Sequence, residues 1–384
     1  GEQRMFQLLA VCPMGLESIV AKEIQELGYE TQVENGRIFF EGDENAIVKC
    51  NLWLRTADRV KIVMGQFKAT TFDELFEKTK ALPWESIIDQ QGNFPVQGRS
   101  VKSTLYSVPD CQAITKKAIV ERLKHAYNEK GWLNESGAKY PVEVSILKDK
   151  VLLTIDTSGS GLNRRGYRLA QGEAPIKETL AASLIKLANW TGDTSLIDPF
   201  CGSGTIAIEA CLIAQNIAPG FNRDFVSEEW NIMPPNIYDD MRDEADKHAN
   251  YDREIQVYAS DIDPEMVEIA KRNAEEVGLA DIIQFSVKDV NTLTIDTEEP
   301  IALIGNPPYG ERIGDRDEVE EMYRYIGTLM KQHDYLSTYI LTSNKEYEHL
   351  VNKKATKRRK LFNGYIECTY YQYWGKKPQT KKES

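Results

Sequence analysis

The chain has 384 residues, 41% of them hydrophobic and 28% charged, and its formal net charge at pH 7 is −12. This length is sufficient for two or three domains, and the composition is that of a globular protein. No apolar stretch is long enough to span a membrane and the beginning lacks a signal-peptide pattern, so we expect neither a membrane protein nor a secreted one.

The cysteines and the charges bear on where the protein works and on what it binds. The six cysteines are scattered without a Cys-x-x-Cys pair, which predicts no metal site and no disulfide framework and favours a reducing, cytoplasmic location. Residues 1–165 carry 22 basic and 22 acidic side chains, so the excess of acid lies entirely in residues 166–384. Because nucleic-acid binding requires a local basic surface rather than a basic protein, the overall charge neither supports nor excludes an RNA partner.

Residues 1–66 predict a small α+β domain. Asn35-Gly36 separates two short extended segments, which is the pattern of a β-hairpin. Apolar periodicity around this hairpin predicts the order βαββαβ of a ferredoxin-like layer, to which we assign a scaffold role. The predicted strands are residues 5–11, 31–34, 37–40 and 59–66, and the predicted helices are residues 16–24 and 45–54.

Residues 67–165 predict a second α+β domain. Lys102 follows its first predicted strand, and Lys116 and Lys117 lie early on its second predicted helix. These lysines are candidate contacts for RNA phosphates, although a solvated helix face explains each of them equally well. The predicted helices are residues 72–81 and 114–128, and the predicted strands are residues 94–101, 142–147 and 151–156.

A flexible turn at residues 156–161 marks the boundary to a third domain, residues 166–384. Arg164 and Arg165 follow this turn. They either bind RNA phosphates or pair with acidic side chains of the third domain. The first helix of that domain is expected to begin near Pro175, because proline suits the first turn of a helix.

A glycine-containing segment then stands between a predicted strand and a predicted helix. It reads Asp198-Pro199-Phe200-Cys201-Gly202-Ser203-Gly204-Thr205. Gly202 and Gly204 allow the backbone to approach a ligand closely, and the following helix directs its N-terminal N–H groups toward it. Strand, glycine turn and helix are the context that a nucleotide-binding loop requires.

Acidic residues follow the next two predicted strands. Asp261 comes after strand 255–259, and its two oxygens suit the two hydroxyls of a ribose. Because a dinucleotide-binding unit places this acid about 20 residues after the glycine loop, we interpret residues 217–253 as an insertion. Asp289, after strand 282–287, can accept an adenine amino group, or it is a simple turn residue. Asp263 is expected to cap the next helix.

The segment Asn306-Pro307-Pro308-Tyr309 follows the apolar run 301–304, which predicts a buried strand. The two prolines end the strand and hold the chain extended. The Asn306 side-chain oxygen and the Pro307 carbonyl can accept both hydrogens of a flat exocyclic amine, and the Tyr309 ring can stack on the base. An ordinary turn would explain Asn-Pro alone. The glycine segment upstream, however, favours the interpretation that the two segments together form a functional site.

The remaining residues complete a seven-stranded sheet. They predict helix 317–332, strand 335–342 and strands within 365–374. A basic run at 353–360, which includes Arg358 and Arg359, precedes the last strand and is a candidate RNA path.

The two motifs resemble the Rossmann-like, S-adenosylmethionine-dependent class I methyltransferases that act on exocyclic amines. The segment from Asn306 to Arg312 resembles the branch that methylates N2 of guanosine in RNA. With its N-terminal half, the chain resembles the bacterial 23S ribosomal RNA guanosine-N2 methyltransferases that carry a THUMP domain, in the form with one methyltransferase domain. This implies an α/β catalytic domain preceded by a ferredoxin-like and a THUMP RNA-binding region, with 23S rRNA or an assembling ribosomal particle as the partner.

The resemblance also implies a site. Asn306, Pro307 and Tyr309 would be catalytic, whereas Glu311 and Arg312 either read the guanine edge or brace the loop. S-adenosylmethionine would be bound by Lys177, Glu178, Thr179, Asp198, Phe200, Gly202, Gly204, Thr205, Asp261, Asp289 and Asn306.

Other functions share some of these features. The Asn-Pro-Pro-Tyr segment would serve equally for N6 of adenine or for the glutamine amide of a release factor. A ribosome-assembly protein with a vestigial methyltransferase fold is a non-catalytic alternative, although it would not need Asp198, Asp261 and Asn306. A nicotinamide oxidoreductase would normally show Gly-x-Gly-x-x-Gly, whereas Ile206-Ala207 stand after Thr205 here.

Overall fold

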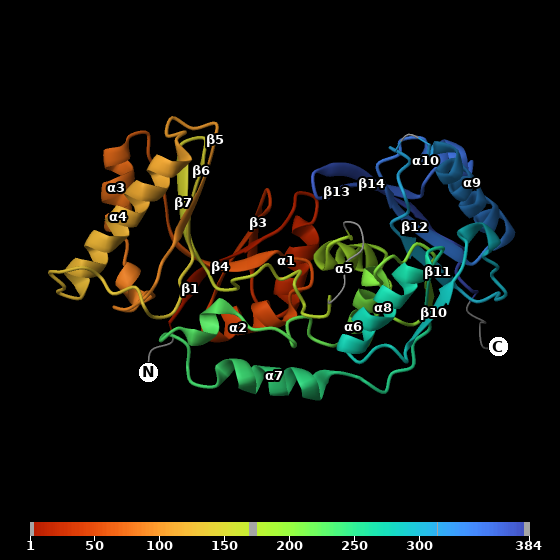
Figure 1. Cartoon of the computed structure of the whole chain (residues 1–384), viewed down its shortest axis with the longest axis horizontal. Coiled ribbons are helices and arrows are strands. Elements are labelled where there is room, and N and C mark those ends of the chain that lie inside the picture. Colours follow the sequence, from red (N-terminus) through yellow and green to blue (C-terminus); the bar gives the residue numbers. More distant parts are fainter. Residues whose placement is uncertain (1–3, 169–174, 313, 380–384) are drawn as a thin grey trace. The chain divides into compact units, whose positions relative to one another are not determined.

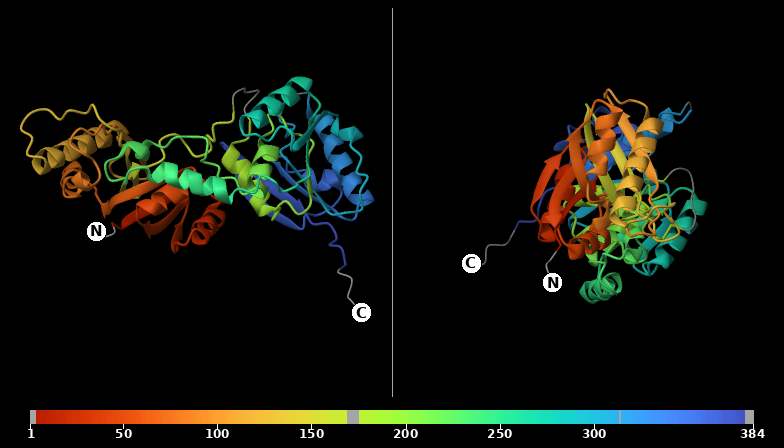
Figure 2. Two further views of the ribbon diagram at one scale, coloured as in Figure 1. Left: turned by 90° about the horizontal axis from the view of Figure 1, so that it is seen from below. Right: turned by 90° about the vertical axis from the view of Figure 1, so that its left-hand side faces the viewer.

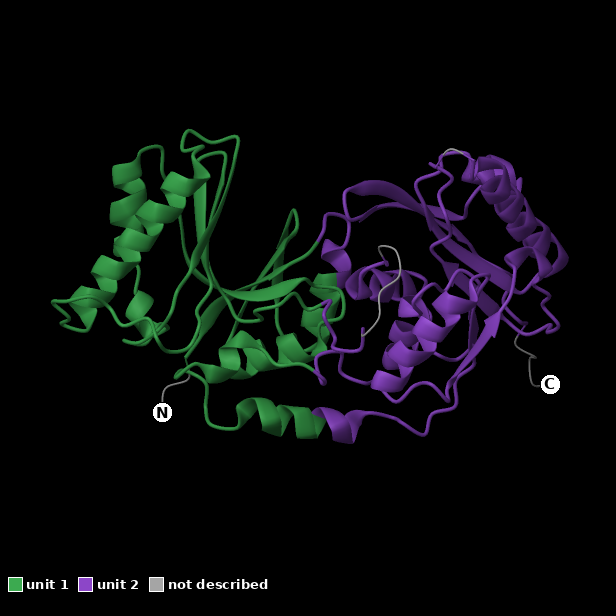
Figure 3. Cartoon of the chain, in the orientation of Figure 1, with its two compact units in different colours: residues 1–12, 20–162, 223–244 green, residues 13–19, 163–222, 245–384 purple. Residues whose placement is uncertain are grey.

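A computed structural model describes residues 4–168, 175–312 and 314–379, which are arranged in two compact units (Figure 3). Unit 1 comprises residues 1–12, 20–162 and 223–244, and unit 2 comprises residues 13–19, 163–222 and 245–384. No helix in the described part of the chain is long and apolar enough to cross a membrane.

Unit 1 is built on one seven-stranded sheet in the order β2-β3-β1-β4-β7-β6-β5. The predicted βαββαβ order is confirmed in β1 (Phe6–Val11), α1 (Glu17–Glu26), β2 (Thr31–Glu34), β3 (Arg37–Gly42), α2 (Glu44–Trp53) and β4 (Arg59–Lys68). The long β4 pairs with β1 along one edge and with β7 (Lys150–Asp156) along the other. Strands from both N-terminal regions of the sequence therefore belong to one sheet.

The second N-terminal region contributes two helices and three strands to this sheet. They are α3 (Phe72–Lys80), α4 (Val108–Ala126), β5 (Val96–Val101), β6 (Val142–Leu147) and β7 (Figure 1). The predicted start of α4 at residue 114 is wrong, because the helix begins at Val108, directly after Ser107 and with a proline in its first turn. Proline lacks the N–H that a first turn leaves unused, so Pro109 begins a helix here instead of ending one.

Part of the predicted insertion packs on unit 1. Trp230 is 2% exposed, stacks on Tyr140 at 4.9 Å between ring centroids, and donates from Nε1 to the Lys139 carbonyl at 2.8 Å. Tyr238, on α7 (Ile237–His248), is buried; its hydroxyl accepts from the Asn51 amide and shares a hydrogen bond with the Ser227 hydroxyl. Residues 223–244 thus supply aromatic core side chains to a unit that lies elsewhere in the sequence.

Unit 2 contains the second seven-stranded sheet, in the order β10-β9-β8-β11-β12-β14-β13. The first five strands of this order are parallel, and β14 runs antiparallel to β12. This confirms the predicted Rossmann-like, seven-stranded fold class. The strands are β8 (Ser195–Asp198), β9 (Val257–Asp261), β10 (Ile283–Val287), β11 (Ile301–Gly305), β12 (Leu336–Thr342), β13 (Lys357–Asn363) and β14 (Ile366–Tyr373).

Helices cover both faces of this sheet, as Figure 2 shows from two further directions. Leu303, Tyr323, Ile340 and Tyr371 belong to one buried apolar cluster, which joins β11, β12 and β14 to α9 (Arg316–Gln332) and α10 (Tyr347–Val351). The remaining helices of unit 2 are α5 (Glu178–Leu187), α6 (Thr205–Ala214) and α8 (Pro264–Glu276). Tyr370 on β14 donates to the Leu184 carbonyl of α5 at 2.8 Å.

One expectation for unit 2 needs correction, and a second is confirmed in more detail. Helix α5 begins at Glu178, with Lys177 as its N-cap, so Pro175 lies before the helix and not in its first turn. The basic run 353–360 lies before the last strand β14, as predicted, and its residues 357–360 belong to the edge strand β13. An edge strand rich in lysine and arginine is common because charge discourages pairing with another chain.

Candidate active site

The predicted site residues meet at the carboxyl ends of the parallel strands of unit 2. Strand β8 ends at Asp198, β9 at Asp261 and β11 at Gly305, directly before Asn306. In open α/β sheets this edge holds the ligand sites. A cavity of about 580 Å³ lies there, lined among others by Phe200, Asp261, Lys288, Asp289, Val290, Asn306, Pro307, Tyr309, Glu311, Arg312, Asn363 and Ile366.

The glycine loop depends on backbone conformations that favour glycine. Gly202 and Gly204 have φ values of +50° and +86°, in the left-handed region. A Cβ on Gly204 would also lie 3.0 Å from the Cβ of Ala270 on α8, so the loop packs closely on that helix. Asn273, buried on α8, donates to the Ser203 carbonyl at 3.0 Å. These contacts fix the loop at the N-terminus of α6.

Asp261 is held by the backbone on both of its carboxylate oxygens. One oxygen accepts the N–H of Gly202 and the other accepts the N–H of Asp263, each at 3.0 Å. Each oxygen keeps a further lone pair for a ligand. Asp263 caps α8 by accepting the N–H of Glu265 at 2.9 Å, as the sequence predicts.

Asp198 is buried beneath this edge, with 1% of its surface exposed. Its Oδ1 accepts the Phe200 N–H at 3.0 Å. Burial raises the pKa of Asp198 to about 8, the Phe200 N–H opposes this shift and the charge of Asp261 adds to it. A cationic group placed beside Asp198 would favour the carboxylate form, so this acid suits the amino group of an amino-acid moiety.

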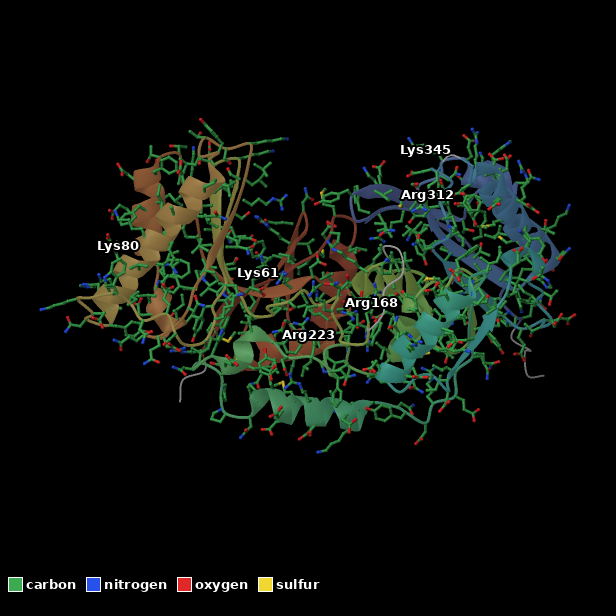
Figure 4. The ribbon with its side chains drawn as sticks, viewed as in Figure 1. Lys61, Lys80, Arg168, Arg223, Arg312 and Lys345 are labelled. Carbon is green, nitrogen blue, oxygen red and sulfur yellow. The ribbon has the colours of Figure 1, made fainter. Side chains whose placement is uncertain are left out.

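The start of α5 lies close to the glycine loop. Lys177 is exposed, whereas Glu178 and Thr179 are buried. Glu178 pairs with Arg168 at 3.3 Å, and the same guanidinium donates to the Thr205 hydroxyl at 2.7 Å (Figure 4 labels Arg168). Burial raises the pKa of Glu178, against the opposing charge of Arg168. Arg168 therefore links α5 to α6, a role that the sequence alone did not indicate.

Asp289 lines the same cavity. It caps the short 3₁₀ turn Val290–Thr292 by accepting the Asn291 N–H at 2.9 Å. The turn and the ligand-binding interpretations of Asp289 are thus compatible, since the residue both caps the turn and lines the cavity.

The Asn306–Tyr309 segment is held by side chains from three other elements. Tyr323 of α9 donates to the Pro308 carbonyl at 2.6 Å, and Asn344, just after β12, donates to the Tyr309 carbonyl at 3.2 Å. Asn363, at the end of β13, donates to the Tyr309 hydroxyl at 3.1 Å, and that hydroxyl donates to Oδ1 of Asn306. Burial raises the pKa of Tyr309, which therefore remains protonated.

Sequence reasoning missed these supporting residues. Tyr323, Asn344 and Asn363 lie 14 or more positions beyond Tyr309 in the sequence and carry no local motif. Only the pairing of β12, β14 and β13 brings Asn344 and Asn363 to the edge where β11 ends.

The residues predicted to contact RNA differ in how exposed their side chains are. Lys102, Lys117, Arg164 and Arg358 are exposed. Lys116 is partly engaged, because it donates to the Phe94 carbonyl at 2.9 Å and pairs with Glu135. Arg359 donates to the Gly15 carbonyl and to the Ser18 hydroxyl, both at 3.0 Å and within unit 2.

Of the two roles predicted for Arg165, the structure shows the second, pairing with an acidic side chain of the third domain. Arg165 is 2% exposed and pairs at 2.9 Å with Glu209, a fully buried carboxylate that also accepts from Tyr167 at 2.9 Å. A buried guanidinium with this partner cannot reach a phosphate, and removing either member would leave the other charge buried without its partner.

Three family models match the chain. They are the RMKL-like methyltransferase domain at residues 165–372, the RlmL ferredoxin-like domain at residues 7–61 and the THUMP domain at residues 69–156. The first alone covers more than half of the chain. The protein belongs to the RMKL-like methyltransferase family.

Relatives of this family match along almost the whole chain. YpsC of Bacillus subtilis, named as a candidate RNA methyltransferase, is 57% identical over 381 residues, which are 99% of both chains. The ribosomal RNA large subunit methyltransferase K/L of Shewanella frigidimarina is 31% identical over 96% of this chain. The present chain spans about half of that enzyme, namely 53% of its length.

Solved structures show the same fold. A protein from Listeria monocytogenes, described as a predicted N6-adenine-specific DNA methylase, is 56% identical, has a TM-score of 0.93, and matches over 97% of both chains. SMU.472, a candidate methyltransferase complexed with SAH, is 44% identical with a TM-score of 0.94, over 98% of this chain and 100% of that one. S-adenosylmethionine is accordingly the cofactor of this methyltransferase family, and the buried Asp198, the glycine loop and Asp261 suit its charged and ribose groups.

Proposed function

We propose that this methyltransferase acts on RNA and methylates the exocyclic N2 of a guanosine, in 23S rRNA or an assembling ribosomal particle. The observation that carries the proposal is the cavity at the carboxyl edge of unit 2. Asn306 and Tyr309 line this cavity together with Asp261 and Asp289. Residues that can accept a flat exocyclic amine and acids that can bind a nucleotide therefore line the same cavity.

Hydrogen bonding explains how the chain would activate a weak amine. The lone pair of a guanine amine is delocalised into the ring, so the nitrogen must become pyramidal as it reacts. Oδ1 of Asn306 and the Pro307 carbonyl would accept the two amine hydrogens, an interaction that strengthens as positive charge develops on nitrogen. The Tyr309 hydroxyl occupies one lone pair of Oδ1 and leaves the other for the amine.

Positioning of the amine against the methyl donor would supply much of the remaining rate enhancement. S-adenosylmethionine supplies the methyl group. Tyr323, Asn344 and Asn363 hold the acceptor segment from three directions, so Asn306 would not need to be ordered when the base arrives. A strong base is unnecessary, because the methylated ammonium is acidic and loses its proton to water.

The choice of guanosine rests on the loop that follows. Glu311 lines the cavity, and one of its oxygens accepts from Ser343 at 2.7 Å. A carboxylate fixed at this position suits the N1–H of guanine, which adenine lacks. The names of the K/L relatives support ribosomal RNA, whereas the name of the Listeria relative supports adenine N6 as the competing substrate. Both substrates would use the same amine acceptors.

We further propose that residues 1–66, 67–165 and 166–384 are the functional divisions of the chain, with RNA recruited in the cytoplasm by residues 67–165. The THUMP match at residues 69–156 supports this assignment. Lys102 and Lys117 are exposed there, as phosphate contacts require.

The test is methylation of ribosomal RNA that lacks the modification, with the modified nucleosides identified by mass spectrometry. We expect N2-methylguanosine from the wild-type protein. Asn306→Ala should lower kcat by about a hundredfold or more, since it removes a transition-state acceptor. Asn250→Ala, at an exposed loop position of the same unit, is the matched control.

The possible products separate the alternatives. If N6-methyladenosine is the product, the proposed mechanism would stand, but the substrate would be adenosine and not guanosine. Cofactor binding without any methylated nucleoside, on both naked RNA and precursor particles, would favour the non-catalytic assembly protein.

A further inference from the structure

The β13–β14 hairpin brings its turn to the edge of the sheet that holds the active-site cavity. Strand β14 is antiparallel to β12, with Thr369 opposite Thr342 at the carboxyl end of β12 and Tyr373 opposite Thr338. The turn between Asn363 and Ile366 consequently lies at the same edge as Asn306. Asn363 and Ile366 both line the cavity.

Tyr365 lies between these two cavity residues and is fully exposed, at 105% of its reference surface. The hairpin beneath it is regular, because strand pairing continues up to Asn363 opposite Ile366. Gly364 takes a φ of +62°, which closes the turn tightly. The turn thus holds an aromatic ring in solvent beside the cavity, where the ring contributes nothing to the core.

Three cationic side chains among the described residues lie near this turn, together with the acidic Glu367. Lys360 pairs with Glu367 at 2.6 Å across the hairpin, and Lys345 adds to the positive environment of Glu367. Arg312 comes from the cavity wall, and Figure 4 shows Arg312 and Lys345 on the same part of unit 2. An exposed ring among cations is the combination that binds unpaired nucleic acid, since every base has a face that stacks and every nucleotide has a phosphate.

We propose that Tyr365 is a stacking platform for the nucleotide next to the methylated one. This rests on the proposed function, in which the target base is unpaired or extruded. An extruded base leaves its neighbour without a stacking partner, and Tyr365 offers that partner directly beside the cavity. Tyr365 is therefore a positioning residue that holds the RNA, whereas Asn306 acts on the amine itself.

The experiment measures RNA binding and turnover of the full chain. Binding of a ribosomal RNA fragment is followed by fluorescence anisotropy with S-adenosylhomocysteine present, and KM and kcat are measured with S-adenosylmethionine. Tyr365→Ala should raise Kd and KM for RNA by about 5- to 150-fold, which corresponds to stacking of one base, while kcat changes much less. Tyr365→Phe keeps the ring and should retain the wild-type affinity.

Trp374 supplies the matched control. It is 55% exposed and follows β14 at the opposite end of that strand from Ile366, so Trp374→Ala should leave RNA affinity unchanged. An active enzyme whose Tyr365→Ala variant binds RNA as tightly as the wild type would overturn the platform and leave the proposed function intact. A wild-type protein that binds RNA but methylates neither naked RNA nor precursor particles would overturn the proposed reaction, and the RNA affinity of Tyr365→Ala would still show whether Tyr365 stacks on a base.

Discussion

At the scale of single residues, the least expected property belongs to Asp198. Burial holds its pKa near 8, so in the native protein without cofactor this carboxyl is largely protonated at neutral pH. The unfolded chain releases the proton near the ordinary pKa of an aspartate, about 3.9. The native state therefore binds more protons between these two values, and the free energy of unfolding falls as the pH rises through that window.

Asp198→Asn should remove this dependence. The variant cannot ionise, so its stability relative to the wild type should increase from about pH 4 to about pH 8, by up to about 1.4 kcal/mol per pH unit, and then level off. Urea unfolding of the cofactor-free proteins at several pH values measures this difference. Asp296→Asn, at an exposed carboxylate, controls for the loss of one charge. A stability difference that does not change with pH would contradict the assignment.

Residue-scale prediction from the sequence succeeded where a side chain follows a strand. Asp261, Asp289 and Asn306 were expected at strand ends, and parallel pairing brings them to one cavity. It left two roles open for Arg165, because an arginine that pairs with a buried acid and one that binds a phosphate look identical in a sequence. The partner Glu209 is recognisable only once α6 is packed.

At the scale of elements, the contact between α9 and α10 depends on a glycine. A Cβ on Gly327 would lie 2.5 Å from the Val351 carbonyl oxygen, which belongs to the backbone of α10. Backbone atoms cannot move aside as the end of a flexible side chain can. Close approach of the two helices therefore requires a residue without a side chain at this position of α9.

Gly327→Ala should lower the free energy of unfolding by about 1–3 kcal/mol. Alanine is favoured over glycine in a helix by about 1 kcal/mol, but the forced separation of α9 and α10 outweighs this gain. Thermal unfolding of both proteins measures the difference. Thr328→Ala, at the exposed neighbouring position of the same helix, should be neutral or slightly stabilising. A Gly327→Ala protein as stable as this control would show that the helices can separate freely.

Element boundaries were predictable only where local chemistry is unambiguous. The start of α8 at Asp263-Pro264 followed from a capping side chain and a proline. The start of α4 was placed too late because Pro109 resembles a helix breaker until Ser107 is known to precede the first turn. In the sequence, residues 357–360 look like a solvated basic run. In the structure they form a strand, because they pair with β14.

At the scale of the whole molecule, the two units are not contiguous in the sequence. The insertion was recognised because it delays Asp261, yet nothing in its composition indicated that residues 223–244 pack on unit 1. In the structure Trp230 and Tyr238 are buried, at 2% and 4% exposure.

This arrangement predicts that a change in the insertion will loosen the N-terminal sheet. Trp230→Ala removes a buried ring stacked on Tyr140 and the hydrogen bond to the Lys139 carbonyl, next to the start of β6. Large-to-small changes at such sites cost about 3–5 kcal/mol. Hydrogen exchange should therefore accelerate in β6 and β7 of unit 1, whereas β8 and β11 of unit 2 retain their protection.

An exposed tryptophan provides the control for this experiment. Trp132 is 97% exposed in unit 1, so Trp132→Ala removes the same side chain without removing buried area, and exchange should stay at the wild-type rate. If Trp230→Ala accelerates exchange in β8 and β11 but not in β6 and β7, the insertion stabilises the methyltransferase unit from which it emerges. Acceleration confined to unit 1 would mean that the catalytic half of the sequence provides part of the core of the RNA-binding half. The N-terminal half would then not be fully stable when expressed without the insertion.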